Sequence, residues 1–445
     1  MTERIQTHSS ARRTLWLWRL LLIVGVPLIF FGGLEGALRL TGIGKPTDFF
    51  IPDEKAGFYR TNPDFTYPFI PAPFDIEPLN FRISKHKSPN SVRLFVFGES
   101  AAQGLPETGF GFSAQLRAQL QARYPDKKIE IYNLGITAIN SHVVYQIARE
   151  AVNFEPDLFV IYMGNNEVVG PYGPGCAYLA KMPPLWMIRA SVWARRLRTG
   201  QWLIDLLGKL ARNKKAMEWK GMETFSENTV RANDPRLEDV YRNFSANLKA
   251  IADLAARAGI KTVLSTVVAN LKDCAPFVSL HRTGLSAEDL KTWQSAFEEG
   301  MLAWNLGANE KAWHGFNAAL KIDSEYAGTY YMLGKVAESR GELELARQNY
   351  LNALHWDALH FRPDSRINDI IRKVAKEGGA QIELVDAARE LGFDPASTGS
   401  ISGREILFEH VHLNWEGNFQ LARLLAEKCA MGGDSTAGHW LSAAE

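Results

Sequence analysis

The fold is decided by the stretch Arg93–Ala101, which reads RLFVFGESA. Its first five residues form a short apolar run that ends at Gly98, as in a strand covered on both faces. Phe112, Leu116 and Leu120 then recur at helical spacing. A strand, a tight Gly-Glu-Ser turn and a helix form a βα unit. A serine at that junction is exposed at the carboxyl edge of a parallel sheet.

The same alternation continues along the chain. Further strands are predicted at Ile129–Tyr132, Leu158–Tyr162, Lys261–Val268 and Gln381–Val385. Apolar periodicity predicts helices near residues 144–151, over 236–258 and after Trp415. Continuous apolar strands that alternate with helices indicate an α/β fold with a parallel sheet and helices on both faces.

Composition narrows the class of protein. The 445 residues are 46% hydrophobic and 22% charged, which excludes a disordered chain or a collagen-like repeat. A net charge of +1 gives no electrostatic reason to expect nucleic-acid binding. Three cysteines form no disulfide framework, and no Cys/His spacing indicates a structural zinc site.

The N-terminus contains a candidate membrane segment. Residues 15–34 are apolar except for Arg19 and are about as long as the roughly 20 residues that cross a bilayer. Arg4, Arg12 and Arg13 precede the span, so the positive-inside rule predicts a cytoplasmic N-terminus and an exported body. A cleaved signal peptide is the alternative, but no strong cleavage motif follows. An uncleaved anchor is therefore expected.

Three segments depart from the strand and helix alternation. Residues 41–91 are rich in Pro and aromatic residues, and an extended lead-in is expected there. Residues 170–230 carry tryptophans interleaved with arginines. A helical insertion packed on the domain is the favoured interpretation, and a segment lying on an anionic membrane surface is the alternative.

The third segment, 286–360, matches itself at an offset of 34 residues. Gly300 pairs with Gly334, and Phe316 pairs with Tyr350. The pattern resembles the tetratricopeptide repeat, although Ala358 stands where its proline is expected. Two repeats are too few to stand alone, so they should lean on the main domain. They could bind a protein partner.

Several polar residues fall at strand ends on one edge of the predicted sheet. Ser100 lies at the junction of the first predicted strand and the helix that follows it. Asn166 follows the third strand, in Gly164-Asn165-Asn166-Glu167. Near the C-terminus, His412 could take the Ser100 proton, and Glu409 could orient its imidazole. Glu409, His410 and His412 also resemble a metal cluster, but no further ligand set accompanies them, and no metal or cofactor is expected.

These motifs together resemble the SGNH (GDSL-type) hydrolases, whose four sequence blocks appear here in order over about 92–280 and 361–428. The blocks contain Gly98-Glu99-Ser100, Gly135 with Ala138, Gly164-Asn165-Asn166-Glu167, and Glu409-His410-Val411-His412. The anchor and the repeats resemble a bacterial branch of this family.

The resemblance implies a flavodoxin-like sheet and a role for each residue. Ser100 is then the nucleophile, His412 the general base and Glu409 its orienting acid. The N–H groups of Ser100 and Ala138 and the amide of Asn166 form the oxyanion hole.

The sequence departs from the family pattern at four positions. Glu99, Glu167 and Glu409 stand where the family has Asp, and Ala138 stands where it has Gly. The longer Glu409 must still reach His412. Alanine lacks the freedom of glycine at positive φ.

The expected function is an exported, membrane-anchored serine esterase acting on lipids, acetylated glycans or small acyl esters. An acyltransferase with the same triad, which passes the acyl group to a glycan hydroxyl, is the first alternative. A scaffold protein that binds partners through its repeats is the second, and the presence of Ser100, Asn166 and His412 counts against it. In an exported domain Cys176 and Cys274 could pair or remain thiols, with Cys429 left over.

The expected organisation has seven parts. They are a cytoplasmic N-terminus (1–14), a transmembrane anchor (15–40), the lead-in (41–91), a first hydrolase part (92–285, with the insertion at 170–230), the tetratricopeptide-like insertion (286–360), a second hydrolase part (361–430) and a tail (431–445).

Overall fold

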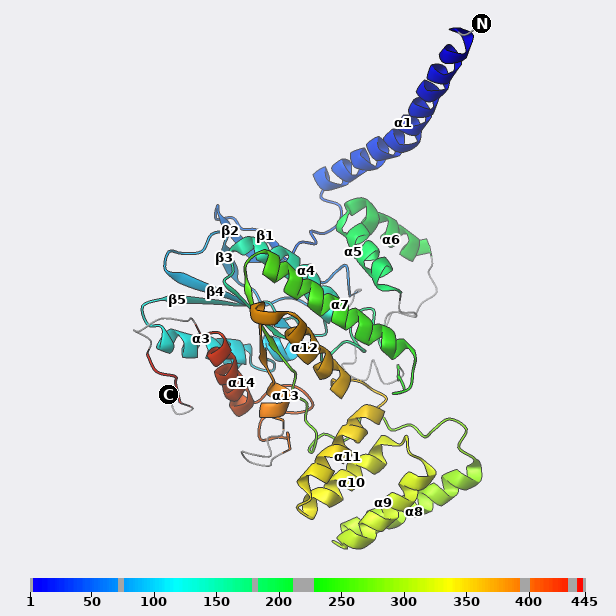
Figure 1. The fold of residues 1–445 in the computed structure, drawn as a ribbon, viewed down its shortest axis with the longest axis vertical. Coiled ribbons are helices and arrows are strands. Elements are labelled where there is room, and N and C mark those ends of the chain that lie inside the picture. The colour runs from blue at the N-terminus through cyan, green and yellow to red at the C-terminus, as the bar shows by residue number, and fades with distance from the viewer. Residues whose placement is uncertain are drawn as a thin grey trace.

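The computed structural model describes residues 3–70, 76–177, 183–210, 228–392, 401–430 and 438–442. Most of the predicted tail, 431–445, therefore lies outside the described residues. The chain forms a long N-terminal helix, a central α/β body and a group of helices at the far end of the body from that helix (Figure 1).

A parallel sheet of five strands forms the centre of the body. Its order is β5-β4-β6-β7-β8, and every neighbouring pair is parallel. The strands are β4 (Ser91–Gly98), β5 (Lys128–Asn133), β6 (Leu158–Tyr162), β7 (Lys261–Ser265) and β8 (Ile382–Val385). In register, Gly98 of β4 lies opposite Tyr162 of β6, so these two strands end together.

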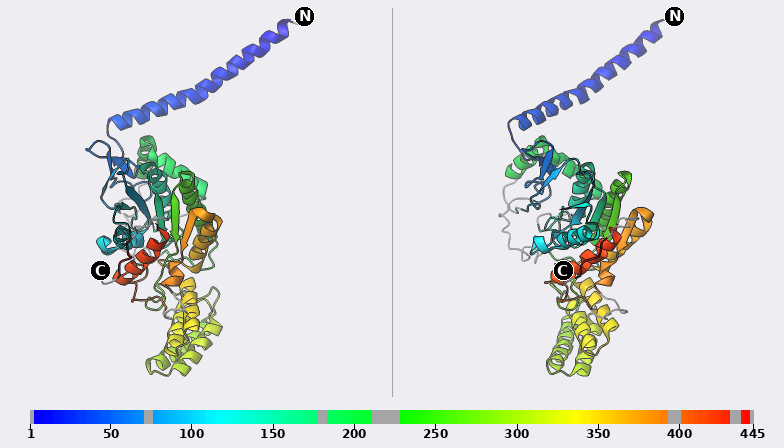
Figure 2. Two further views of the ribbon diagram at one scale, coloured as in Figure 1. Left: turned by 60° about the vertical axis from the view of Figure 1, so that its left-hand side comes forward. Right: turned by 90° about the vertical axis from the view of Figure 1, so that its left-hand side faces the viewer.

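Helices cover both faces of the sheet, as the sequence predicts. One layer contains α4 (Ser141–Ala151), α7 (Arg236–Arg257) and α12 (Ser365–Glu377). The other contains α3 (Phe112–Arg123) and α14 (Trp415–Lys428), which pack against each other (Figures 1 and 2). Short helical turns complete the body: α2 (Ser100–Gln103), α13 (Ala387–Glu390), and 3-10 turns at Thr108–Phe110, Val152–Phe154 and Gly379–Gln381.

The predicted α/β fold with five strands is confirmed, with two differences at strand ends. The predicted strand Lys261–Val268 stops at Ser265. Beyond it, the N–H of Val267 donates to the side chain of Asn368 on α12, at 2.8 Å, instead of to a neighbouring strand. Gln381 belongs to a 3-10 turn and not to the last strand.

The lead-in contains a small sheet that the sequence analysis did not predict. Strands β1 (Phe50–Pro52), β2 (Phe58–Thr61) and β3 (Arg82–Ser84) form an antiparallel sheet in that order. Phe49 and Phe65 are buried, and the Phe50 ring packs against the rings of Phe95 and Phe154. The lead-in therefore shares its core with the body.

Arg93, which opens the decisive apolar run, is fully buried inside β4. Its guanidinium pairs with Glu130 of β5 at 2.9 Å and donates to the carbonyls of Ser84 and Phe154 at 3.0 and 2.6 Å. A buried charge is tolerated when it is paired and hydrogen-bonded in this way. Arg93 thus joins the small sheet to the large one.

The N-terminal helix α1 (Glu3–Leu40) extends away from the body (Figure 2). Its segment Trp18–Leu40 is long and apolar enough to cross a membrane, with a mean hydropathy of 2.1 and no burial inside the structure. A signal sequence has the same properties. Helices α5 (Leu185–Arg196) and α6 (Arg198–Leu210) lie next to the C-terminal end of α1 (Figure 1).

Four helices lie between β7 and α12 in the chain: α8 (Ala287–Asn305), α9 (Asn309–Ile322), α10 (Ala327–Ser339) and α11 (Leu343–Trp356). They form two hairpins, α8 with α9 and α10 with α11. A side chain added at Gly300 would meet the Phe316 ring at 2.7 Å, and one at Gly334 would meet the Tyr350 ring at 2.6 Å. The same glycine–ring contact occurs twice, 34 positions apart.

The cysteines form no disulfide within the part of the chain that the structure describes. Cys176 and Cys429 are buried, and the Cys274 thiol lies 3.6 Å from the carbonyl of Ala275. Of the two predicted alternatives for Cys176 and Cys274, a disulfide or two thiols, the structure has the two thiols.

Candidate active site

Ser100 stands at the carboxyl edge of the sheet, after β4, which lies between β5 and β6. It is the first residue of α2, and only Glu99 separates it from Gly98, the last residue of β4. A Cβ at Gly98 would lie 2.0 Å from the carbonyl oxygen of Tyr162, so only glycine allows the ends of β4 and β6 to approach this closely. The close approach brings Ser100 next to the loop that follows β6.

Glu99 fastens that loop. Its carboxylate is fully buried and accepts hydrogen bonds from the N–H of Gly164 at 2.9 and 3.1 Å. Burial, together with the nearby charge of Glu167, raises the pKa of Glu99 to about 8. The amides of Gly164, Asn165 and Asn166 act in the opposite direction, because they favour the charged form. Glu99 thus organises the loop that carries Asn166.

Glu167, the last residue of that block, connects the loop to α4. Its two carboxylate oxygens accept from the N–H and from the hydroxyl of Ser141, both at 2.8 Å. Burial raises the pKa of Glu167 to about 7. Asn247 of α7 donates to the same hydroxyl at 3.0 Å. Glu99 and Glu167 therefore both act on the backbone that supports the site.

Asn166 and Ala138 lie on loops at the carboxyl ends of β6 and β5, on either side of Ser100 at the end of β4. The Asn166 amide donates to the carbonyl of Ile139 at 3.1 Å, so the two loops are in contact. Ala138 has φ +57°, the left-handed conformation that favours glycine. Its N–H has no hydrogen-bond acceptor among the described residues.

The loop after β5 also packs directly against α2. A Cβ at Gly135 would lie 2.7 Å from the N–H of Gln103, and the side chain of Asn133 donates to the carbonyl of Ala102 at 2.8 Å. Asn133 also donates to the hydroxyl of Ser113 at 2.9 Å. Asn133, two residues before Gly135, thus contributes to the site although no role was predicted for it.

His412 and Glu409 come together before α14. One carboxylate oxygen of Glu409 accepts from the N–H of His412 at 3.1 Å and contacts the Nδ1 of the same residue. The His412 Nε2 is buried and has no hydrogen-bond partner among the described residues, and no hydrogen bond joins it to Ser100 in this structure. The Nδ1 of the His412 imidazole is thus bound to Glu409, and its Nε2 has no partner among the described residues.

His410, which the sequence analysis did not assign, occupies the second oxygen of Glu409. That oxygen accepts from the N–H of His410 at 2.7 Å and contacts its Nδ1. Burial alone would raise the pKa of Glu409, but the hydrogen bonds from the two imidazoles outweigh burial and lower it. Asn270 fixes the backbone of this turn, because its side chain donates to the Glu409 carbonyl at 2.8 Å.

Glu409, His410 and His412 are also the one group of potential metal ligands in the described part of the chain, with ligand atoms within 4.8 Å of one another. The same atoms serve the carboxylate–imidazole contacts described above. The arrangement leaves Nε2 of His412 for proton transfer, and it has no need of an ion to orient the ring.

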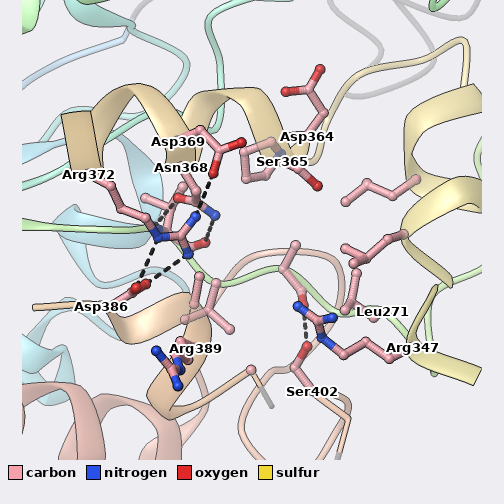
Figure 3. Close-up of a pocket in the computed structure, with 18 of the residues that line it drawn as sticks. Leu271, Arg347, Asp364, Ser365, Asn368, Asp369, Arg372, Asp386, Arg389 and Ser402 are labelled. Carbon is pink, nitrogen blue, oxygen red and sulfur yellow. Dashed lines mark hydrogen bonds and ion pairs between the residues drawn. The ribbon is translucent and has the colours of Figure 1, made fainter. Parts of the chain in front are cut away.

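Three cavities border this edge of the sheet, and one of them, of about 10 Å³ against the loop of Gly164 and Asn165, is very small. The other two are larger. The smaller, of about 230 Å³, lies beside α2 and the His412 turn and is mainly apolar, with Leu105, Phe110, Phe408, Leu413 and Trp415 in its wall. The larger, of about 570 Å³, lies between α11 and α12 and is lined by charged residues that include Arg347, Asp369, Arg372 and Asp386 (Figure 3). The wall of the smaller cavity includes Phe408 and Leu413, the chain neighbours of Glu409 and His412, but none of the candidate catalytic residues.

No protein-family model matches the sequence, and no curated protein sequence matches it significantly. Among solved structures, the chain is similar to an acetyl xylan esterase (12% identity, TM-score 0.31) that is covered completely. It is also similar to a GDSL-like lipase from Parabacteroides merdae (13%, TM-score 0.35) and a lipase/acylhydrolase from Enterococcus faecalis (13%, TM-score 0.32), each covered to 94%. Each alignment covers 76% of this chain. A function for this chain must therefore be argued from the residues of its own site.

The raised pKa of Glu99 predicts a pH-dependent stability. The folded state holds the proton up to about pH 8, whereas the unfolded state releases it near the ordinary glutamate pKa of 4.5. The contribution of Glu99 to stability therefore falls as pH rises through this window. We expect the melting temperature of the Glu99→Gln variant to rise relative to that of the unchanged chain between these limits. Glu167 titrates in both proteins, so its effect largely cancels. Exposed Glu54→Gln is the control, and a constant Glu99→Gln difference would contradict the prediction.

The conformation of Ala138 predicts a second stability effect. A left-handed residue other than glycine costs about 1–2 kcal/mol, and glycine recovers this at an entropic cost of about 0.4–1 kcal/mol. Ala138→Gly should therefore raise the free energy of unfolding by roughly 0.5–1 kcal/mol. Ala256→Gly is the matched control, because Ala256 is an exposed residue inside α7, where glycine should cost stability. Equal losses in both variants, measured by urea unfolding, would refute this account.

Proposed function

We propose that the chain is a serine ester hydrolase of the SGNH type, with Ser100 as nucleophile and His412 as general base. The observation that carries the proposal is the state of the His412 ring. Glu409 holds its Nδ1, while its Nε2 is buried and without a partner. An imidazole held in this way has one tautomer available for accepting a proton at Nε2.

The reaction proceeds in two halves. The Ser100 Oγ attacks the carbonyl carbon of the ester, and His412 Nε2 takes the hydroxyl proton. The tetrahedral intermediate collapses, the alcohol leaves with that proton, and an acyl-serine remains. Water then attacks the acyl-serine while His412 accepts its proton. The proton returns to Ser100 Oγ as the carboxylic acid leaves.

The negative charge on the intermediate requires fixed donors. We assign this role to the N–H groups of Ser100 and Ala138 and to the side-chain amide of Asn166. They follow three adjacent strands at one edge of the sheet, and the N–H of Ala138 is free of competing acceptors among the described residues. Each fixed donor is worth about 3–4 kcal/mol of the barrier in comparable sites.

Glu409 stabilises the imidazolium that forms at His412. Its lowered pKa keeps the carboxylate charged throughout the pH range of catalysis, so the glutamate replaces the aspartate of the family without loss of contact. The apolar cavity beside Leu105, Phe110 and Trp415 is suited to the acyl group of the ester.

We further propose that α1 anchors the enzyme in a membrane, with the N-terminus inside and the catalytic body exported. The apolar segment Trp18–Leu40 and the arginines that precede it in the sequence support this orientation. The tetratricopeptide-like helices are then exported with the body, and a protein partner for them stays a prediction.

The nucleophile is tested by fluorophosphonate labelling of the full-length chain in detergent. The unchanged protein should be labelled, because the probe reacts only with an activated serine. Ser100→Ala should abolish both labelling and hydrolysis of p-nitrophenyl acetate, with an unchanged melting temperature. Ser324→Ala, an exposed serine of the helical insertion, should keep both. Full activity in the Ser100→Ala variant would refute the mechanism.

The roles of His412 and Glu409 predict a ranking. In serine proteases, loss of the base costs on the order of 10⁶-fold in kcat, and loss of its orienting acid costs on the order of 10⁴-fold. His412→Ala should therefore reduce kcat more than Glu409→Gln, which keeps an acceptor for Nδ1 but loses the charge. Ester hydrolysis by purified variants measures both. The opposite ranking would mean that another residue orients the base.

A further inference from the structure

Helices α5 and α6 each have an apolar face that no described residue covers. On α5, Ile188 and Val192 are buried against the body, whereas Trp186 and Trp193 remain 71% and 65% exposed. The exposed pair is separated by seven residues, which places both on the side of the helix that faces away from the body.

Helix α6 repeats this arrangement. Trp202, Leu203, Leu206 and Leu207 are all exposed, at spacings that define one face. Gln201 is buried and bonds to the backbone of Lys45 in both directions, at 2.8 and 3.0 Å. We call the exposed residues of the two helices the outer apolar face: Trp186, Met187, Trp193, Trp202, Leu203, Leu206 and Leu207.

The C-terminal end of α1 is bonded to the start of α6. The Glu35 carboxylate accepts from the N–H groups of Arg198 and Thr199 at 3.1 and 2.9 Å, and from the Thr199 hydroxyl at 3.0 Å. An acidic side chain at the N-terminus of a helix satisfies its free N–H groups and its dipole. The outer apolar face is therefore fixed next to the point where α1 meets the body (Figure 1).

The charge of the two helices is positive. Residues 185–207 contain four arginines and one aspartate. Arg196 pairs with Asp48 and Glu150, and Arg189 bonds to Asn247, so these two are used inside the protein. Arg195 takes part in none of the ion pairs among the described residues, but it is half-buried and close enough to Tyr67 and Tyr172 for its charge to act on both. Exposed tryptophan and leucine next to arginine are typical of helices that lie in the interface of an anionic bilayer.

We propose that the outer apolar face of α5 and α6 lies on an anionic membrane surface, in the same leaflet from which α1 emerges. This inference rests on the proposed anchoring by α1. The two interpretations of residues 170–230 are then both satisfied, because one face of the helices packs on the body and the other contacts lipid.

Because α1 already holds the protein at the membrane, even a weak contact between lipid and the outer apolar face can form. Once α1 is in the membrane, contact of α5 and α6 with lipid is intramolecular and benefits from a high effective concentration. One spanning helix leaves the body free to rotate and tilt. A second contact at α5 and α6, rigidly bonded to α1 through Glu35, fixes the orientation of the body on the membrane.

Fluorescent labels on the full chain test this proposal in vesicles of phosphatidylglycerol and phosphatidylcholine. In a chain whose partly exposed Cys274 is replaced by serine, an environment-sensitive dye is attached to a new cysteine in three separate variants: Ile29→Cys on α1, Trp193→Cys on α5 and Leu306→Cys at the end of α8. All three positions are exposed in the structure, at 78%, 65% and 75%. Quenching by lipids that carry a nitroxide near the headgroup or deep in the chain reports the depth of each dye.

We expect the Trp193→Cys label to be quenched mainly by the shallow nitroxide, at least about twofold more than the Leu306→Cys label, since interfacial helices lie roughly 5–10 Å deep. The Ile29→Cys label should be quenched by the deep nitroxide. Quenching at Ile29→Cys without quenching at Trp193→Cys would overturn the inference and leave the anchor intact. No quenching at Ile29→Cys would overturn the anchor. A blue-shifted but unquenched Trp193→Cys label would mean that protein, and not lipid, covers this face.

A charge reversal tests the anionic lipid. Arg195→Glu should reduce quenching of the Trp193→Cys label in vesicles with phosphatidylglycerol and have little effect in pure phosphatidylcholine. Lys291→Glu, an exposed residue of α8, is the matched control and should change neither value. Equal effects of Arg195→Glu in both lipids would refute the electrostatic part of the proposal.

Discussion

The buried carboxylate of Glu99 is the interaction on which the candidate site depends. It accepts the backbone N–H of Gly164 and so holds the loop after β6 against the end of β4. Gly98 allows the two strand ends to touch, and Glu99 fastens them. A buried carboxylate beside a second one, Glu167, is electrostatically unfavourable, and the backbone amides of the loop offset that cost. The arrangement of the candidate site thus depends on one buried polar side chain, Glu99.

Much of this arrangement could be predicted from the sequence, because parallel strands bring their carboxyl ends to one edge. Once Arg93–Phe97 and Leu158–Tyr162 are identified as strands, the residues that follow them must be neighbours. Ser100 and Asn166 lie at that edge as expected. The geometry also explains the departure at Ala138, since the loop keeps the left-handed conformation without glycine.

The features that were missed depend on tertiary contacts that leave no local pattern. Arg93 was counted in an apolar run, but its charge is paired with Glu130, 37 residues away. Asn133 and His410 are residue types that are common in loops. Only the fold shows that Asn133 donates to the backbone of α2 and that His410 binds the same carboxylate, Glu409, as His412 does. The three strands of the lead-in are too short for their alternation to be read among so many aromatic residues.

The position of the site within the molecule bears on the substrate. The amino end of β4 is next to the lead-in, as the bonds of Arg93 to Ser84 and Phe154 show. Helix α1 leaves the body at the end opposite the helical insertion (Figure 1). The carboxyl ends face the helical insertion, where the Tyr331 hydroxyl donates to the Lys272 carbonyl beyond β7 at 2.8 Å (Figures 1 and 2). In the membrane orientation proposed above, the candidate catalytic edge opens away from the bilayer. For the esterase proposed above, this orientation favours esters of the exported compartment, such as acylated glycans, over the acyl chains of the lipids around α1.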